Sequence, residues 1–147
     1  MPRIYLDVCC LNRPFDDQTQ ARIRLESEAV LILLARCEAD DWELVSSEAV
    51  ELEISRTPDP ERRRRVEAIA ASAQKVVRVG TAEVDRAQQF EAQGISAYDA
   101  LHLACAESAL ADVLLTTDDT LVRKSARLTE KSDVRVENPL VWLREVS

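Results

Sequence analysis

The 147-residue sequence predicts an α/β protein in which a central parallel sheet is covered by helices on both faces. Short apolar segments alternate with longer stretches of helical periodicity along the chain, the pattern of parallel strands joined by crossover helices. The segment 113–116 is apolar almost throughout, as expected of a central strand in such a sheet. A hydrophobic fraction of 46% is sufficient for a core, and we expect one domain over residues 1–147.

The chain begins with a short strand that is followed by an acidic residue. Ile4, Tyr5 and Leu6 favour a strand, and the apolar run continues through residues 8–11, interrupted by Asp7. Burial of a carboxylate is unfavourable unless it is paired, hydrogen-bonded or bound to a cation. We therefore expect Asp7 to belong to a larger polar site.

The remaining elements alternate between helix and strand. A loop is predicted over 12–17, a helix over 19–37, a strand over 42–46, a helix over 48–56 capped by Ser47, and a helix over 61–73 started by Asp59 and Pro60. They continue with a strand over 75–79, a helix from Thr81 ended by Gly94, a buried helix over 96–110, the strand 113–116, a helix over 118–126, an edge strand over 134–136 and a closing helix from Asn138.

Composition argues against several other classes of protein. No apolar run reaches the length of a membrane helix, and the N-terminus lacks a signal-peptide pattern, so we expect a cytoplasmic protein without a membrane partner. The net charge of −8 opposes simple electrostatic binding to nucleic acid, unless several of the acids hold divalent cations. The four cysteines lack the paired spacing of zinc sites, and we expect reduced, buried thiols at Cys9, Cys10, Cys37 and Cys105.

Four acidic residues occupy positions where they could form a site. Asp7 and Asp118 follow predicted strands, whose carboxyl ends share one edge of a parallel sheet and are where ligands bind. Asp99 stands in the first turn of the buried helix. Glu53 falls in the apolar sector of its helix, whereas Glu51 falls on the opposite side, where we expect a solvated face.

Two of these acids also have a structural interpretation. Asp118 is equally well placed to cap the following helix, and Ser96 with Asp99 matches a capping box. No Lys or Arg lies close in sequence to Asp7, Asp99 or Asp118, however, and such a cluster stays ionised only beside cations. Oxygen ligands without a set of His or Cys indicate Mg²⁺ or Mn²⁺ rather than zinc. One or two such ions would support phosphodiester cleavage.

These residues are also where the sequence resembles the PIN-domain nucleases. Residues 4–7 resemble the opening strand of that family with its first acid, residues 47–54 the second block, residues 98–104 the third and residues 115–118 the fourth. The blocks occur in the family's order over nearly the whole chain. The resemblance implies a three-layer α/β/α sandwich and an Mg²⁺- or Mn²⁺-dependent endoribonuclease acting on RNA. Small VapC-like members are toxins held by an antitoxin and form dimers, so it also implies an antitoxin partner and a homodimer.

The resemblance implies roles for individual residues. Asp7, Asp99 and Asp118 would hold the metal, Glu53 would complete the catalytic acids by holding a second ion or orienting the water, and Thr116 would be a hydrogen-bonding neighbour that contacts substrate.

The chain departs from the family's pattern at two places. Cys9 stands where Ser or Asn is common, with Asn12 as an alternative polar group, and Glu51 leaves the register of the second block open by two residues. We favour Glu53 over Glu51 because of its place in the apolar sector of the helix.

Three further features have more than one interpretation. His102 follows Asp99 by three residues and is expected either packed in the core or hydrogen-bonded beside the acids. The Arg62–Arg65 run is expected on a solvated helix face, with RNA phosphates or an acidic partner segment as the alternative. Arg13 is a candidate phosphate contact. The alternative function is a non-catalytic module of the same fold that binds metal, RNA or protein.

Overall fold

The computed structural model describes residues 1–129 and 132–146. Its centre is a five-stranded sheet in the order β3-β2-β1-β4-β5, in which every neighbouring pair is parallel. The strands are β1 (Arg3–Leu6), β2 (Glu43–Ser47), β3 (Lys75–Val77), β4 (Val113–Leu115) and β5 (Arg135–Glu137). The predicted parallel sheet is confirmed, with a buried β4 beside β1 and with β5 at the edge.

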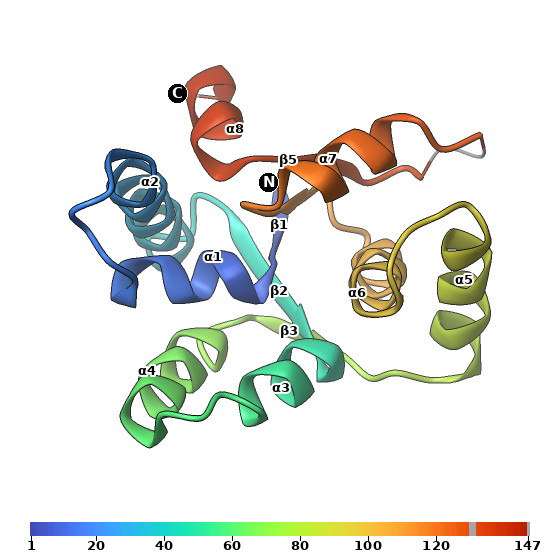
Figure 1. Ribbon diagram of the computed structural model, residues 1–147, viewed down its shortest axis with the longest axis horizontal. Coiled ribbons are helices and arrows are strands. Elements are labelled where there is room, and N and C mark those ends of the chain that lie inside the picture. Colours follow the sequence, from blue (N-terminus) through green and yellow to red (C-terminus); the bar gives the residue numbers. More distant parts are fainter. Residues whose placement is uncertain (130–131, 147) are drawn as a thin grey trace.

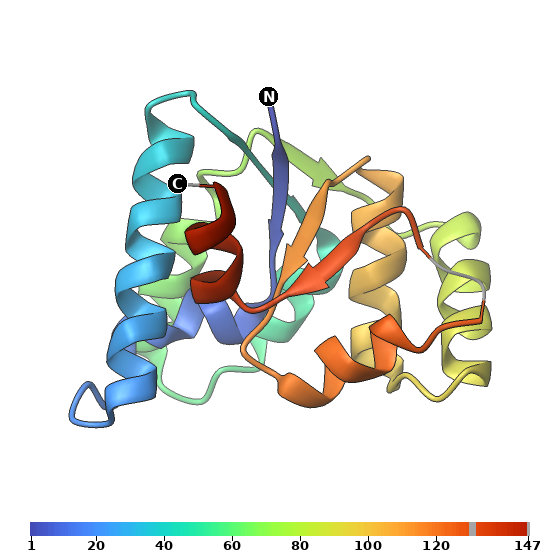
Figure 2. The same ribbon diagram turned by 90° about the horizontal axis from the view of Figure 1, so that it is seen from above.

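Helices cover both faces of this sheet, which confirms the three-layer α/β/α sandwich. Figures 1 and 2 show α2 and α8 on one side of the strands and α5 and α6 on the other. The helices are α1 (Val8–Asn12), the 3₁₀ helix η1 (Arg13–Phe15), α2 (Ala21–Glu38), α3 (Glu48–Ser55), α4 (Pro60–Ala70), α5 (Thr81–Ala92), α6 (Ala97–Ser108), α7 (Asp119–Ala126) and α8 (Pro139–Val146). Within the described ranges, no helix combines the length and apolar character needed to cross a membrane.

The predicted helix boundaries at three places are confirmed by their capping geometry. Ser47 Oγ accepts the backbone N–H of Val50 at 3.2 Å, and Asp59 caps α4, with Pro60 as its first residue. Gly94 lies just beyond the end of α5 with φ of +100°, a conformation that glycine adopts without a steric penalty.

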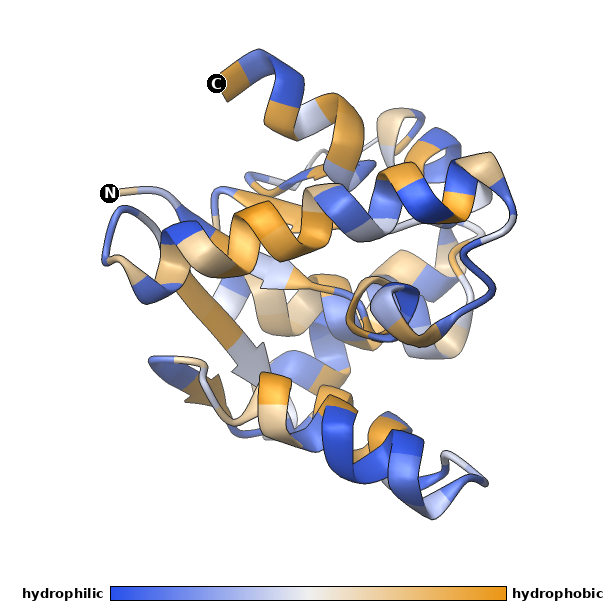
Figure 3. Cartoon of the chain, turned by 90° about the vertical axis from the view of Figure 1, so that its left-hand side faces the viewer, coloured by the Kyte–Doolittle hydropathy of each residue, from blue (hydrophilic) through white to orange (hydrophobic). Residues whose placement is uncertain are grey.

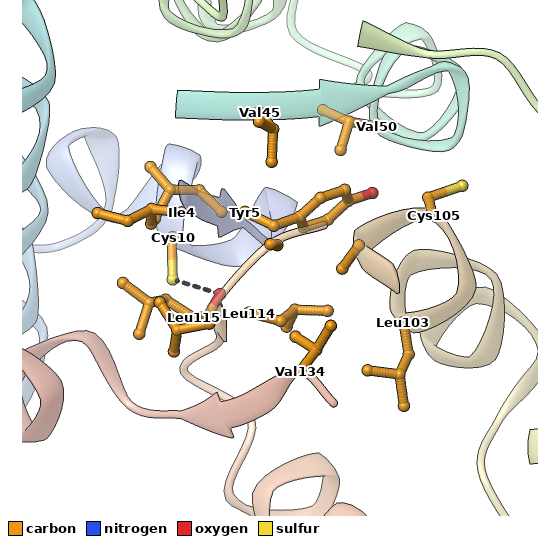
Figure 4. Packing of buried hydrophobic residues seen from close by; sticks show 14 of the residues in the cluster. Ile4, Tyr5, Cys10, Val45, Val50, Leu103, Cys105, Leu114, Leu115 and Val134 are labelled. Atoms are coloured by element: carbon orange, nitrogen blue, oxygen red, sulfur yellow. Dashed lines mark hydrogen bonds between the residues drawn. The ribbon is translucent and has the colours of Figure 1, made fainter. Parts of the chain in front are cut away.

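The segment after β1 differs from the prediction. Residues 8–12 form α1 and residues 13–15 a 3₁₀ turn, where an extended apolar run followed by a loop was expected. The cause is Asp7, whose Oδ1 accepts the backbone N–H of Val8 at 2.8 Å and so starts a helix directly at the strand end. In that helix Cys10 is buried and its thiol donates to the carbonyl of Leu115 (Figure 4), whereas Cys9 is only half-buried.

The core packs against both faces of the two central strands. Figure 4 shows Ile4 and Leu115 on the side of α1, while Tyr5 and Leu114 lie toward α6. All of these side chains are at most 3% exposed. The Tyr5 side chain extends toward Cys105 of α6. The Tyr5 hydroxyl thereby reaches Ser47, at the carboxyl end of β2. The four cysteines are all free thiols, and three of them are buried as expected.

A buried carboxylate on α2 holds one side of the fold together, although the sequence pattern gives no sign of it. The side chain of Glu26 is 2% exposed. It accepts hydrogen bonds from Arg13 Nε at 3.0 Å, Arg22 Nε at 3.1 Å and Asn138 Nδ2 at 2.6 Å. These contacts join α2 to η1 and to the start of α8.

Replacing Glu26 with Ala should destabilise the fold, because it leaves the Arg13 guanidinium partly buried without this carboxylate. We expect a loss of about 2–3 kcal/mol in the free energy of unfolding, below the ~3–5 kcal/mol of a fully buried pair because Arg22 is half exposed. Urea denaturation followed by circular dichroism measures it. Glu28→Ala, at an exposed position of the same helix, is the control and should change stability by less than about 0.5 kcal/mol.

Candidate active site

Asp7 lies at the carboxyl end of β1, in the middle of the sheet, and is 6% exposed. Its Oδ2 accepts the hydroxyl of Thr116 at 2.9 Å and the thiol of Cys9 at 3.4 Å, in addition to the Val8 N–H at Oδ1. Among the described residues, no Lys or Arg forms an ion pair with this carboxylate. Neutral donors therefore fix the direction of the Asp7 side chain, and in the described part of the chain the one basic group near its carboxylate is the imidazole of His102.

Thr116 connects Asp7 to the next acid along the edge. It follows β4, is fully buried, and donates its hydroxyl to Asp7 while the same oxygen accepts the backbone N–H of Asp118 at 3.1 Å. The expected neighbour of Asp7 is therefore in place. Its contact with substrate stays a prediction.

A buried histidine, His102, lies between the carboxylates of Glu53 and Asp7. Oε1 of Glu53 lies 2.9 Å from Nε2 of His102, and that nitrogen lies 3.9 Å from Oδ1 of Asp7. A carboxylate can only accept, so Nε2 donates to Glu53. Candidate ligand atoms of Asp7, Glu53 and His102 all lie within 4.8 Å of one another, the one such trio found in the described part of the chain.

The other nitrogen of His102 is bound from the sheet. Nδ1 lies 2.7 Å from the hydroxyl of Tyr5, which in turn lies 2.7 Å from Oγ of Ser47, the cap of α3. Both ring nitrogens are thus engaged by protein groups, and the imidazole orients Glu53 from behind. The sequence signal for this role was the spacing of His102 from Asp99, but its hydrogen-bond partners come from β1 and α3.

Burial and negative charge act in opposite directions on His102. Burial lowers the pKa of the imidazole, but the hydrogen bond to Glu53 and the nearby negative charges, above all Asp7, raise the pKa above its ordinary value overall. Burial also raises the pKa of Tyr5 well above its usual range, so its phenol stays protonated. On their inner side the acids therefore face two hydrogen-bond donors, the imidazole of His102 and the phenol of Tyr5 behind it.

Asp99 is the third member of the cluster. It is half-buried in the first turn of α6, and Ser96 donates its hydroxyl to Oδ2 at 2.9 Å, rather than accepting a backbone N–H as a capping serine would. Burial raises the pKa of Asp99, and the charges of Asp7 and Asp118 raise it further. Asp99 therefore lies within the electrostatic reach of both other aspartates.

Asp118 caps a helix, as its structural interpretation predicted, and one of its carboxylate oxygens takes no part in the cap. It caps α7, with Oδ1 accepting the backbone N–H groups of Thr120 at 2.9 Å and Leu121 at 3.4 Å. The cap uses Oδ1 alone. The side chain is exposed at the edge of the sheet, and its second oxygen is available to a ligand.

The structure separates Glu51 from this cluster. Glu51 is exposed and lines a different hollow, between α3 and α4, with Ser46 and Ala70. Ala49, Val50 and Ile54 are buried, as the helical periodicity predicted, which turns Glu53 toward the acids.

Three other residues with predicted roles are engaged in scaffold contacts. Arg13 pairs with Glu26 and Asp16, and the Asn12 amide donates to the carbonyl of Val8 at 3.0 Å instead of approaching Asp7. In the Arg62–Arg65 run, Arg64 and Arg65 are exposed as expected. Arg62 is half-buried, and its guanidinium pairs with Asp16 at 2.7 Å and donates to the carbonyl of Phe15. The geometry thus offers no support for a phosphate contact by Arg13.

Cys9 supplies the polar group that the sequence left open between Cys9 and Asn12. Its thiol contacts Asp7 Oδ2 and Thr116 Oγ1, both at 3.4 Å, and accepts the backbone N–H of Thr117 at 3.3 Å. Treating Cys9 as a buried apolar side chain was therefore wrong. A thiol can make these contacts because sulfur is a weak donor and acceptor.

The donor set suits a divalent cation. Candidate ligand atoms of Asp7 and Glu53 lie within 4.8 Å of one another, and the charges of Asp7 and Asp118 act on Asp99. Among the described residues, none of these four acids pairs with Lys or Arg. Oxygen-rich sites of this kind are typical of hard cations. The bonds from Thr116 and His102 hold two of the carboxylates in place, as outer-shell partners of metal ligands commonly do.

Thr116→Val should weaken metal binding without unfolding the protein. It keeps the shape of the buried side chain but removes the hydroxyl that orients Asp7, and we expect the affinity for Mn²⁺, measured by isothermal titration calorimetry, to fall about 10- to 100-fold. Thr117→Val is the matched control, because no hydrogen bond joins the Thr117 side chain to the acids. Equal affinities in the two variants would contradict the orienting role.

Comparisons with known proteins agree with this geometry. A sequence profile of the PIN domain matches residues 4–127. Among solved structures, the chain is similar to one in the crystal structure of VapBC2 from Rickettsia felis bound to a DNA fragment from their promoter, with a TM-score of 0.62 and 14% sequence identity over 92% of this chain and 98% of that chain. No curated protein sequence matches the chain.

Proposed function

Because the chain belongs to the PIN domain family, a family of nucleases, we propose that it is an endoribonuclease that requires Mg²⁺ or Mn²⁺. The observation that carries this proposal is the state of Asp7. Its carboxylate is almost fully buried, is held by neutral donors without a Lys or Arg partner in the described part of the chain, and offers a ligand atom within 4.8 Å of one on Glu53. A carboxylate in that position favours a bound cation over a partner side chain.

We assign the metal ligands to Asp7, Asp99 and Asp118, with Glu53 as the fourth catalytic acid. When bound, one or two divalent ions would activate a water and stabilise the leaving oxygen of the phosphodiester. Glu53 is 33% exposed at its side chain, so it can accept a hydrogen bond from water while His102 holds its other side. Thr116 and Cys9 keep Asp7 from rotating away from the cluster.

We also propose that the protein works in the cytoplasm with an antitoxin as its partner, and that it forms a homodimer. Support for the antitoxin comes from the VapBC2 structure, which holds a toxin–antitoxin pair. Several apolar side chains are exposed on α2 and α8, in the region that faces the viewer in Figure 3, and such a surface suits a protein partner. They are Leu25, Leu31, Ile32 and Val141.

The proposed activity is tested by incubating the purified chain with RNA in Mn²⁺, in Mg²⁺ or in EDTA. We expect cleavage only with the metals, and we expect Asp7→Asn to reduce it to the EDTA background while circular dichroism shows an intact fold. Asp85→Asn, which removes one carboxylate from an exposed position of α5, should leave the rate unchanged. RNA binding without metal-dependent cleavage would instead favour the non-catalytic module.

A second pair of variants decides which glutamate acts. Glu53→Gln should lower the rate of cleavage about 10²- to 10⁴-fold, the usual contribution of a positioned acid or base, because the amide cannot take up a proton or hold a cation as firmly. Glu51→Gln should change it less than about 2-fold, because that side chain is exposed outside the cluster. The reverse order of effects would assign the second block to Glu51.

A further inference from the structure

An arginine and a tyrosine from different helices lie together beside the acid cluster. Arg56 follows α3, and its backbone N–H donates to the carbonyl of Glu53 at 3.2 Å. Tyr98 is in the first turn of α6, directly before Asp99. The guanidinium of Arg56 donates to the hydroxyl of Tyr98 and lies 5.7 Å from the centre of its ring. Tyr98 is thus the direct chain neighbour of Asp99, and Arg56 follows Glu53 by three residues.

The charge of Arg56 is not used by the scaffold. Arg13, Arg22 and Arg62 all pair with carboxylates, but in the described part of the chain Arg56 is bonded to Tyr98 and forms no ion pair. Its side chain is exposed. The remaining N–H groups of the guanidinium are therefore available to an anion, and a phosphate accepts such bonds well.

Tyr98 offers a complementary group. It is 37% exposed. Aromatic residues make up only 4% of the sequence, so an exposed ring is a scarce feature of this surface. Single-stranded nucleic acids are bound by exposed aromatic rings, on which unpaired bases stack, together with cations that contact the backbone. In a duplex the bases already stack on one another. An exposed aromatic ring therefore favours single-stranded over double-stranded nucleic acid.

We propose that Arg56 and Tyr98 together bind single-stranded RNA beside the cleavage site, with Arg56 contacting a phosphate and Tyr98 stacking on an unpaired base. This inference rests on the proposed ribonuclease function. It also addresses an electrostatic difficulty, because a chain with a net charge of −8 and a cluster of acids repels a polyanion unless a cation stands next to the site.

The proposal is tested by the binding of a fluorescein-labelled RNA of about 10 nucleotides in the Asp7→Asn background, measured by fluorescence anisotropy at several salt concentrations. Arg56→Gln should weaken binding about 5- to 10-fold and make the slope of log affinity against log salt shallower by about 0.7, the contribution of one phosphate contact on a single strand. A merely structural role for Arg56 would leave that slope unchanged.

Two substitutions of Tyr98 separate stacking from hydrogen bonding. Tyr98→Leu removes the ring and should weaken binding about 5-fold or more with an unchanged salt slope, whereas Tyr98→Phe keeps the ring and should bind nearly as well as the parent. The matched control for charge is Arg64→Gln, an exposed arginine of α4 for which the described residues provide no ion pair, and it should have little effect.

Cleavage assays distinguish failure of this proposal from failure of the proposed function. In the otherwise unmodified chain, Arg56→Gln and Tyr98→Leu should raise the RNA concentration for half-maximal rate and leave the rate at saturation within about 2-fold. Cleavage by the wild type with unaltered binding in these variants would overturn the RNA-binding role alone. The RNA-binding role would also be overturned if the chain bound duplex RNA as tightly as single-stranded RNA, or if Arg64→Gln weakened binding as much as Arg56→Gln. It would equally be overturned if the variants affected only the binding of a protein partner. Weakened binding in variants of a chain that never cleaves RNA would reject the nuclease and support the RNA contact.

Discussion

The structure depends on one unfavourable placement, the carboxylate of Asp7 at the end of the central strand. It is screened from water and receives hydrogen bonds from neutral groups of α1 and of Thr116, which follows β4. Such bonds fix a carboxylate in space but do not neutralise it, so the electrostatic free energy of burial is only partly recovered. The negative charges of Asp99 and Asp118 increase the difficulty. A fold tolerates this arrangement where an external cation completes it.

Arg13, Arg22 and Arg62 form their ion pairs with carboxylates other than the four candidate acids. Arg13 and Arg22 converge on Glu26, and Arg62 binds Asp16, so these three guanidinium groups join η1, α2 and α4. Arg22 also binds Asp119, directly after Asp118, but in the described part of the chain it forms no ion pair with the four candidate acids. The contacts that join η1, α2 and α4 stabilise the side of the molecule opposite α5 and α6 (Figure 1). The ion pairs of these arginines thereby leave the four candidate acids to the proposed metal, and leave the guanidinium of Arg56 without an ion pair in the described part of the chain.

Local patterns predicted the fold and much of the site, because parallel strands, helix caps and helical faces are encoded within a few residues. The side of α3 on which Glu53 lies followed from the burial of Ala49, Val50 and Ile54. Features that arise from tertiary contacts were not predictable in this way. Helix α1 forms because Asp7 caps it at a strand end, and the partners of His102 come from β1 and α3. Glu26 looks like any glutamate of an amphipathic helix until Asn138 and two arginines surround it.

The double role of Thr116 has a mechanical consequence. One hydroxyl oxygen holds the side chain of Asp7 and the main chain of Asp118, so the start of α7 and the junction between β1 and α1 cannot shift independently. Any displacement of α7, for instance by a molecule pressing on its outer surface, would be transmitted over two hydrogen bonds to the most buried acid of the cluster. Thr116 therefore couples the position of Asp7 to the start of α7, so that a contact on the outside of the β4–α7 unit can alter the geometry at the centre of the site.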